Sequence, residues 1–390
     1  MNQDISYGRV EKIGGHQILT GWLSARHPLR HLDVSLFTAA LAAAGIGCVA
    51  IYSATRPSLL ALGSDPNFYL KRQLAFLALS LVIFVISMLF DYRQLKGLAP
   101  LIYLGGLGLL FLVLSPIGHT SLGAQRWITV GILQIQPSEI MKLVIIVTLA
   151  ALWADKGADS GFGKVALAVL LAAVPAGLIY LQPDLGTVLV LVFLAFSIVL
   201  VSGARLRWIA LLVVLGIGAF VLVLNLGLLH AYQIQRITGF LDQKSNSTAA
   251  YNLRQSRTAV ASGGLTGKGL FKGTQTNLDY VPENHTDFIF TVVGEETGFA
   301  GSLLLLGLLA FLIWRALRIA VISKDQFGSR LAAGIAAMLA FQVFINVGMT
   351  IGIVPVVGIP LPFVSYGGSS LLTSFAAVGV LMNIHMRRFL

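Results

Sequence analysis

The 390-residue chain has few charged residues, and this scarcity limits what it can be. Asp, Glu, Lys and Arg make up only 11% of it, whereas soluble domains carry roughly 25%. Hydrophobic residues account for 56%, more than a soluble fold can hide from water. They fall in runs of about 17 to 24 residues, the length that crosses a hydrocarbon layer of ~30 Å as a helix. The composition therefore excludes a soluble protein and predicts an integral membrane protein.

Cysteine is nearly absent, since Cys48 is the single one in the chain. No disulfide within the chain can therefore staple the fold. Cys48 lies in an apolar run, where we expect an ordinary core residue. The first 32 residues also lack a short apolar core followed by a small-residue cleavage site. They predict a cytoplasmic tail, after which the first span acts as an uncleaved insertion signal.

Acidic residues are fewer than basic ones, and the formal net charge is +11. Basic residues that alternate with apolar spans are topology signals, so we do not expect a nucleic-acid partner. With the N-terminus inside, the cytoplasmic segments hold sixteen Lys and Arg, and the short outer loops hold four. This asymmetry predicts a multi-pass protein of the cytoplasmic (inner) membrane with both termini in the cytoplasm.

The apolar runs predict an all-α fold of about ten transmembrane helices, embedded in the membrane. A cytoplasmic tail, residues 1–32, would precede one transmembrane domain, residues 33–390. A long extracytoplasmic loop, residues 230–286, would join the seventh and eighth helices, with part of it folded back onto the bundle. The expected spans lie near 33–54, 73–90, 97–115, 137–153, 163–181, 184–202, 206–229, 287–316, 328–351 and 366–386.

Acidic residues within or beside the spans are candidate functional residues, because a charge inside a membrane is costly. Asp33 and Asp91 fall at cytoplasmic ends of spans, where we expect a solvated boundary role. Glu139, Asp184 and Asp287 instead fall near the outer ends of three spans that all run from outside to inside. The topology therefore predicts that these three carboxylates converge on the outer membrane face.

Lys142 follows Glu139 by three residues, so both lie on one side of the predicted helix and can pair or share a polar cavity. A purely structural ion pair is the alternative interpretation. Pro137 and Pro183 stand in the first turns of their helices, where proline is tolerated. Helix capping would suffice to explain Asp184. It does not explain Lys142, which lies a turn deeper and needs an anionic partner.

Five segments in order along the chain carry more specific patterns. They are Gly123-Ala124-Gln125-Arg126-Trp127-Ile128, Gln136-Pro137-Ser138-Glu139, Gln182-Pro183-Asp184-Leu185-Gly186, Pro282-Glu283-Asn284-His285-Thr286-Asp287-Phe288-Ile289-Phe290 and Pro360-Leu361-Pro362-Phe363-Val364-Ser365-Tyr366-Gly367-Gly368-Ser369-Ser370. These segments resemble the signatures of the SEDS family, from about residue 33 to the C-terminus. Residues 273–275 and 348–352 resemble the RodA members of the family more than the FtsW members. One departure is Thr297, where leucine is usual.

The resemblance implies a glycosyltransferase that polymerises lipid II into peptidoglycan strands during cell elongation. Its expected partners are a class B penicillin-binding protein and glycan linked to undecaprenyl pyrophosphate. Asp287 matches the essential aspartate of the family, and we expect it to be the general base. Trp127 matches an important tryptophan, although a place in the aromatic belt of the membrane surface is the alternative.

The expected substrate contacts surround this base: Trp127, Arg126, Glu139, Lys142, Asp184, Glu283, His285 and Ser365. Among them, Arg126 and Lys142 are the candidates to bind a pyrophosphate. His285 alone is a weak metal signal. The sequence gives no certain cofactor and leaves open whether a divalent cation, Mg²⁺ or Mn²⁺, assists.

Two other functions fit a chain of many spans, namely a lipid II flippase and a structural scaffold. A flippase needs binding chemistry that is reachable from both membrane faces, whereas the candidate acids gather on the outer face. A scaffold leaves the outer cluster of acids and Lys142 unexplained. The sequence therefore favours the polymerase over the flippase, and the flippase over the scaffold.

Overall fold

The computed structural model describes residues 31–116, 118–121, 124–130, 133–155, 161–227, 231–244, 247–278 and 280–388. Nearly all of the predicted N-terminal tail lies outside these residues, as do Gly123 of the first motif and parts of the predicted outer loop. Among the described residues, ten apolar helices form the body of the molecule. They are α2 (Val34–Ala61), α3 (Phe68–Leu89), α4 (Tyr92–Leu114), α5 (Pro137–Leu152), α6 (Phe162–Leu181), α7 (Leu185–Val201), α8 (Leu206–Asn225), α12 (Ile289–Ile322), α13 (Gln326–Ile351) and α14 (Gly368–Arg387).

Each of the ten predicted runs overlaps one of these helices, with bounds that differ by up to seven residues. In the described part of the chain, eight helices are long and apolar enough to cross a membrane. The other two are shorter, since α5 has 16 residues and α7 has 17. The predicted helical membrane fold is confirmed, whereas the count of ten crossings stays a prediction.

Local sequence explains where several helices begin. Asp33 caps α2, because its Oδ1 accepts a hydrogen bond from Leu36 N at 3.2 Å. Asp184 caps α7 in the same way, with 3.1 Å between its Oδ1 and Thr187 N. Pro137 occupies the first position of α5, where its missing N–H costs no hydrogen bond.

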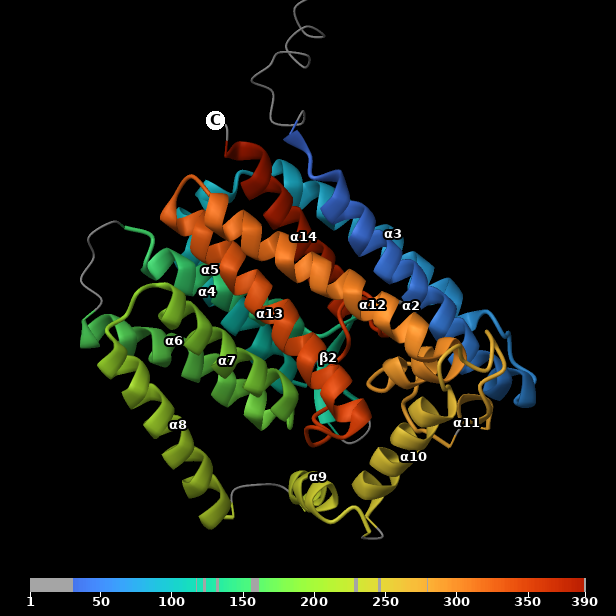
Figure 1. Cartoon of the computed structure of the whole chain (residues 1–390). Coiled ribbons are helices and arrows are strands. Elements are labelled where there is room, and N and C mark those ends of the chain that lie inside the picture. The colour runs from blue at the N-terminus through green and yellow to red at the C-terminus, as the bar shows by residue number, and fades with distance from the viewer. Residues whose placement is uncertain are drawn as a thin grey trace, which may run out of the picture.

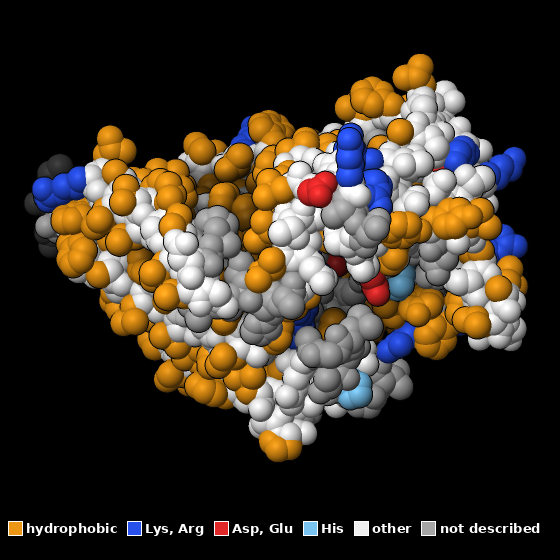
Figure 2. All heavy atoms as spheres, turned by 90° about the horizontal axis from the view of Figure 1, so that it is seen from below, with side chains coloured by type: hydrophobic (Ala, Val, Ile, Leu, Met, Phe, Trp, Pro, Cys, Tyr) orange, Lys and Arg blue, Asp and Glu red, His pale blue; other side chains and the backbone are white. Residues whose placement is uncertain are grey.

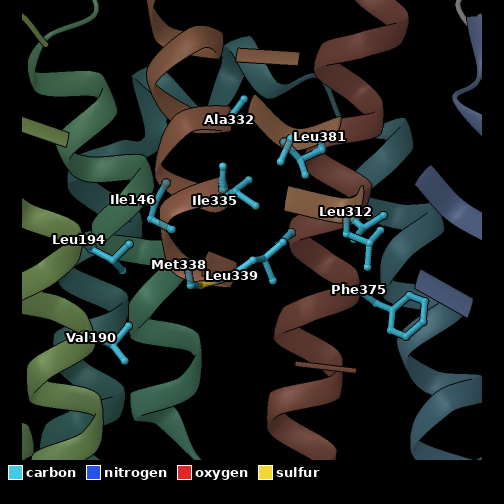
Figure 3. Packing of buried hydrophobic residues seen from close by; sticks show 14 of the residues in the cluster. Ile146, Val190, Leu194, Leu312, Ala332, Ile335, Met338, Leu339, Phe375 and Leu381 are labelled. Atoms are coloured by element: carbon cyan, nitrogen blue, oxygen red, sulfur yellow. The ribbon is translucent and has the colours of Figure 1, made fainter. Parts of the chain in front are cut away.

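Helix α13 lies in the middle of the bundle. Figure 3 shows its side chains Ile335, Met338 and Leu339 between α5 and α7 on one side and α12 and α14 on the other. These side chains are almost completely buried. The predicted core role of Cys48 is also confirmed, since its side chain is buried in α2. Helix α13 thus packs against helices on both of its sides.

The start of α2 and the end of α14 lie at one end of the bundle (Figure 1). The opposite end carries three further helices and a small sheet. They are α9 (Ala231–Leu241), α10 (Thr248–Ser262), α11 (Thr274–Asn277) and the antiparallel strands β1 (Gly118–Ser121), β2 (Ala124–Val130) and β3 (Leu133–Ile135). We refer to this as the loop end. The predicted folding back of the long loop is confirmed, because α10 packs against α12 and α13. The sheet was not predicted.

Glu295 fastens the long loop to α12. Its buried carboxylate accepts hydrogen bonds from Lys268 Nζ at 2.7 Å, from Gln275 N at 2.8 Å and from Thr276 N at 3.0 Å. Gly298 interrupts α12 with a φ of 66°, and an added Cβ there would collide with the backbone of the loop. Glycine is therefore required at this close approach.

Asp33 corrects one expectation from the sequence. It is not a solvated residue at a span end, because only 5% of it is exposed and Arg315 binds its carboxylate. Asp91 agrees better with its predicted boundary role. It caps α4 through Arg93 N, remains partly exposed and pairs with Arg387 at 3.0 Å.

Candidate active site

A cavity of about 600 Å³ opens at the loop end of the bundle. This volume is typical of sites that bind small ligands. Figure 2 looks onto this end and shows charged side chains towards its hollowed middle, with hydrophobic side chains on the flanks. The cavity is lined from α3, β2, α5, α7, α9 and the segments that precede α12 and α14. Its charged lining residues are Arg72, Arg126, Glu139, Lys142, Asp184, Arg236, Glu283 and Asp287.

The predicted convergence of Glu139, Asp184 and Asp287 is confirmed as a matter of position, because all three line this cavity. Asp287 lies just before α12, and its backbone is fixed by α13. Asn346 Nδ2 donates hydrogen bonds to Asp287 O at 2.9 Å and to Ile359 O at 2.8 Å. This bridge fixes the backbone from which the Asp287 carboxylate reaches the cavity.

Gly358 lets the Asp287 carboxylate lie against the chain that precedes α14. A Cβ added at Gly358 would lie 3.0 Å from Asp287 Oδ2 and 3.5 Å from Arg236 Nη1. Gly358 also has a φ of +82°, in the left-handed region that favours glycine. One small residue therefore makes room for an acid and a cation side by side.

The environment of Asp287 favours its neutral form. Burial is the largest cause and raises the pKa of Asp287 to about 6. The charges of Glu283 and Asp184 act in the same direction, whereas Arg236 and Arg126 lower the pKa. A position beside a helix N-terminus would favour the charged form, so burial outweighs that effect here. A carboxyl group with this pKa can exchange a proton near neutral pH.

Glu139 and Lys142 form a buried ion pair on one side of α5, as their spacing predicts. Lys142 Nζ lies 2.7 Å from Glu139 Oε1, and the side chains are only 2% and 5% exposed. The second carboxylate oxygen, Oε2, is buried without a hydrogen-bond partner among the described residues. Both residues line the cavity, so the pair has a polar face that is available to a ligand.

Asp184 is already occupied by protein donors. Its Oδ2 accepts hydrogen bonds from Thr187 Oγ1 at 2.9 Å, from Gln136 Nε2 at 3.1 Å and from Ser138 Oγ at 3.2 Å. Its Oδ1 caps α7. Asp184 therefore joins the start of α5 to the start of α7 and leaves little capacity for a further contact.

Arg126 and Trp127 come from β2, and both line the cavity as predicted. Arg126 Nε donates to Gln182 O at 2.9 Å, and Nη2 donates to Pro183 O. From α9, Tyr232 Oη donates to Pro183 O at 2.7 Å. The turn between α6 and α7 is thus fastened from both sides, with the Arg126 guanidinium facing the cavity.

Arg236 and Arg72 line the cavity but were not predicted. Arg236 lies on α9, where its Nη1 donates to Val357 O at 2.7 Å and its guanidinium lies 5.6 Å from the ring centre of Tyr232. The four-residue spacing of Tyr232 and Arg236 places both on one face of a helix. This spacing is the signal that could have indicated Arg236 within the long loop. Arg72, in the first turns of α3, carries no comparable signal.

Two predicted substrate contacts do not line the cavity. His285 packs instead against the rings of Tyr69 and Tyr366, with ring centres 5.0 and 5.6 Å away. Ser365 Oγ donates to Thr286 O at 2.6 Å and accepts from Leu361 N at 2.8 Å. Their side chains join the segment before α12 to the segment before α14, and direct contact of either residue with a substrate stays a prediction.

Glu283 does line the cavity as predicted. It accepts a hydrogen bond from Thr286 Oγ1 at 2.9 Å and remains exposed. Within the described residues, no three His, Cys, Asp or Glu side chains are arranged to hold a metal ion. The cationic side chains that line the cavity are Lys142, Arg72, Arg126 and Arg236.

Residues 33–389 match the family of FtsW, RodA and SpoVE, which is described as a family of cell cycle proteins. The chain belongs to this family. The resemblance to SEDS proteins is thereby confirmed over the range in which the motifs lie. The FtsW/RodA/SpoVE family includes relatives that cover nearly all of the chain.

Two similar sequences are bacterial family members. The peptidoglycan glycosyltransferase MrdB of Escherichia coli K12 is 38% identical over 359 residues, which cover 92% of this chain and 94% of MrdB. The stage V sporulation protein E of Bacillus subtilis 168 is 39% identical over 356 residues, with 90% and 96% covered. Both alignments thus extend over almost the whole of each protein.

Two similar solved structures show the same fold. The crystal structure of the rod shape determining protein RodA of Thermus thermophilus has a TM-score of 0.69 and 32% identity, covering 92% of this chain and 98% of RodA. The second structure is of a peptidoglycan synthase complex that is described as coordinating polymerization and crosslinking. One chain of that complex has a TM-score of 0.76 and 33% identity to this chain. That match covers 92% of this chain and 98% of the other.

Proposed function

We propose that this chain is a peptidoglycan glycosyltransferase that joins lipid II units into glycan strands during cell elongation. The observation that carries the proposal is the cavity, which places the carboxyl of Asp287, with its raised pKa, among fixed cations. Family relatives named peptidoglycan glycosyltransferase support the reaction class. A carboxylate base and a cationic clamp are the two groups that transfer from a lipid-linked pyrophosphate requires.

In the proposed reaction, the C4 hydroxyl of an acceptor sugar attacks the anomeric carbon of the donor. Asp287 accepts the hydroxyl proton as the new C–O bond forms. The bond between the anomeric carbon and the pyrophosphate oxygen breaks, and undecaprenyl pyrophosphate leaves with the bonding electrons. General base catalysis of this kind contributes roughly 10²- to 10⁴-fold in rate.

The leaving pyrophosphate needs fixed positive charge. Lys142 and Arg126 line the cavity and are our candidates to bind it, with Arg236 beside Asp287 as a third cation. Such groups are most effective when they are already oriented in a poorly hydrated site. The ion pair with Glu139 orients Lys142, and hydrogen bonds to the α6–α7 turn orient Arg126. Trp127 and Glu283 are the proposed contacts to the sugars.

A lipid II flippase is less well supported, because the candidate chemistry lies at one end of the bundle. The deciding experiment is incubation of the purified protein with labelled lipid II in detergent micelles, followed by separation of glycan products. Micelles have no second leaflet, so a flippase leaves lipid II unchanged, whereas a polymerase produces glycan chains of increasing length. Absence of polymer, both with and without the partner, would contradict the proposal.

We propose a class B penicillin-binding protein as that partner. A structural neighbour belongs to a peptidoglycan synthase complex that is described as coordinating polymerization and crosslinking. This supports a partner that crosslinks the glycan strands. The substrate and product are lipid II and the glycan linked to undecaprenyl pyrophosphate. A divalent cation, Mg²⁺ or Mn²⁺, is not assigned a place in this mechanism.

Both termini are proposed to lie in the cytoplasm, with the cavity at the outer face of the inner membrane. The start of α2 and the end of α14 lie at the same end of the bundle, opposite the loop end (Figure 1), and the cavity lies at the loop end. A reporter that is active only outside the membrane should therefore give no signal at the C-terminus and a strong signal when inserted near residue 245. The reverse pattern would contradict this orientation.

Arg236→Gln should shift the pH dependence of polymerisation. In the wild type, kcat/KM should fall below about pH 6, because protonated Asp287 cannot accept a proton. Arg236 lowers the pKa of Asp287, so its removal should raise that pKa and move the acidic limb to higher pH. The measurement is initial polymerisation rate against pH at low lipid II concentration.

Arg257→Gln is the matched control for this experiment. Arg257 also lies in the long loop, but it binds Gln243 Oε1 at 2.7 Å and does not line the cavity. Its profile should match that of the wild type. An acidic limb that stays in place, or moves to lower pH, in Arg236→Gln would rule out Asp287 as the titrating group.

A further inference from the structure

A cluster of arginines lies at the end of the bundle opposite the cavity. Arg315 and Arg318 belong to the last turns of α12, and Arg388 follows α14. Arg318 and Arg315 both lower the pKa of the Arg388 guanidinium, after burial, and Asp33 raises it. The cluster therefore brings three positive charges within electrostatic range of one carboxylate.

Asp33 does not neutralise this cluster. Its carboxylate is bound by Arg315, with 2.8 Å between Arg315 Nε and Asp33 Oδ2, and it also accepts from Ser35 Oγ and caps α2. No carboxylate among the described residues lies within ion-pair distance of Arg318. Residues 1–30 hold four Lys and Arg and two Asp and Glu, so their composition adds no excess of acid. Among the described residues, the charge of Arg318 is thus not compensated by a carboxylate, and this favours an external anion.

The surface around Arg318 is exposed and largely apolar. Trp314, Leu317, Arg318 and Val321 are all exposed and recur at the spacing of one helix face. Trp314 is 50% exposed, and the guanidinium groups of Arg315 and Arg318 lie 5.7 and 5.6 Å from its ring centre. Tryptophan beside arginine on an apolar helix is typical of the boundary between lipid tails and headgroups.

The position of Arg318 along α12 agrees with that boundary. From the interruption at Gly298, where the outer loop meets α12, to Arg318 there are twenty residues. At about 1.5 Å per residue this stretch is ~30 Å long, which is the thickness of a hydrocarbon core. The guanidinium therefore lies at the level of the lipid headgroups, and Leu317 lies beside the part of the acyl chains nearest to them.

We propose that Arg318 and Arg388, together with Trp314, bind the headgroup phosphate of an anionic phospholipid in the leaflet at this end. The guanidinium groups supply charge and hydrogen bonds to the phosphate. Leu317, which is also exposed, lies one residue before Arg318 on the same helix and can contact the acyl chains of that lipid. This lipid site is separate from the cavity, so it does not depend on the proposed glycosyltransferase activity.

The test is binding of dioleoyl phosphatidylglycerol and dioleoyl phosphatidylcholine to the delipidated full chain in detergent, counted by native mass spectrometry. Each arginine at a membrane surface is worth about 5-fold in affinity for an anionic lipid. Phosphatidylglycerol should therefore bind roughly 25-fold more tightly than phosphatidylcholine. Arg318→Gln should lower that affinity about 5-fold. Because Arg318 is exposed, this variant should keep the thermal stability of the wild type.

Arg207→Gln is the matched control, since Arg207 also stacks on a tryptophan, 4.7 Å from the ring centre of Trp208, at the start of α8. It should leave the tight phosphatidylglycerol site unchanged, whereas Trp314→Leu should weaken it. Equal affinity for both lipids, or wild-type affinity in Arg318→Gln, would overturn the proposal. Displacement by an equal concentration of glycerol phosphate would show a site for small anions and would also overturn it.

Discussion

Asp287→Asn should reduce glycan polymerisation at least ~100-fold, the lower limit expected for loss of a general base. The amide keeps the shape and polarity of the side chain but cannot accept the proton of the acceptor hydroxyl. Asn346 fixes the backbone of residue 287, so the variant should fold, insert and bind both lipid II and its partner as the wild type does. The measurement is the initial rate of polymerisation by purified protein, with the melting temperature recorded on the same sample.

Asp65→Asn is the control for this prediction. Asp65 is an acid in the turn between α2 and α3, outside the cavity, and pairs with Lys71 at 2.7 Å. Its loss should leave polymerisation unchanged. If Asp287 only holds the loop against α12, Asp287→Asn should lose thermal stability and partner binding in step with activity. Near-normal polymerisation would refute the assignment and turn attention to Glu139, Asp184 or Glu283.

Lys142→Met should also abolish most activity, and it should destabilise the protein. The pair with Glu139 is almost completely buried, so removal of the ammonium strands a carboxylate. Breaking a buried ion pair in this way typically costs about 3–5 kcal/mol of folding free energy. Loss of a fixed cation at the leaving group should cost roughly 100-fold in rate. Thermal unfolding and polymerisation rate are the two measurements.

The double variant Lys142→Met/Glu139→Gln separates these two effects. It removes both charges, so no uncompensated carboxylate remains and the melting temperature should recover. Activity should stay low, because the cation is still missing. Full activity in Lys142→Met, or recovery of activity together with stability in the double variant, would show that the pair is purely structural.

The sequence predicted the helices and the meeting of the acids for simple reasons. In a membrane an apolar run forms a helix, because the helix satisfies its own backbone hydrogen bonds. Successive helices cross the membrane in opposite directions, and this determines which helix ends lie at the same membrane face. Glu139, Asp184 and Asp287 therefore could be placed together without coordinates. The pairing of Lys142 with Glu139 followed from a three-residue spacing on one helix.

Other parts of the site depend on contacts between distant segments, which no local pattern reveals. Arg236 reaches Asp287 because α9 folds back and Gly358 leaves room for both side chains. His285 and Ser365 carried the right chemistry within the right motifs, yet their side chains join two segments of backbone rather than line the cavity. The polar residues of β1–β3 also gave no periodicity that indicated a sheet.

The same limit explains Asp33. At a span end an acid is expected to remain solvated, but the partner that buries it, Arg315, comes from α12 at the far end of the sequence. Only the packing of α2 against α12 brings the two together. Sequence reasoning was thus reliable for the ends of helices and for residues on one helix, and it failed where the outcome depends on a side-chain contact between distant segments.

Release of undecaprenyl pyrophosphate tests the central claim most directly, because it reports cleavage of the donor bond itself. Purified wild-type protein and Asp287→Asn should be compared on lipid II, with lipid II binding measured on the same samples. The wild type should release the lipid pyrophosphate in step with new glycosidic bonds. Asp287→Asn should bind lipid II normally and release at least ~100-fold less. Release by Asp287→Asn at a rate close to that of the wild type would contradict the account.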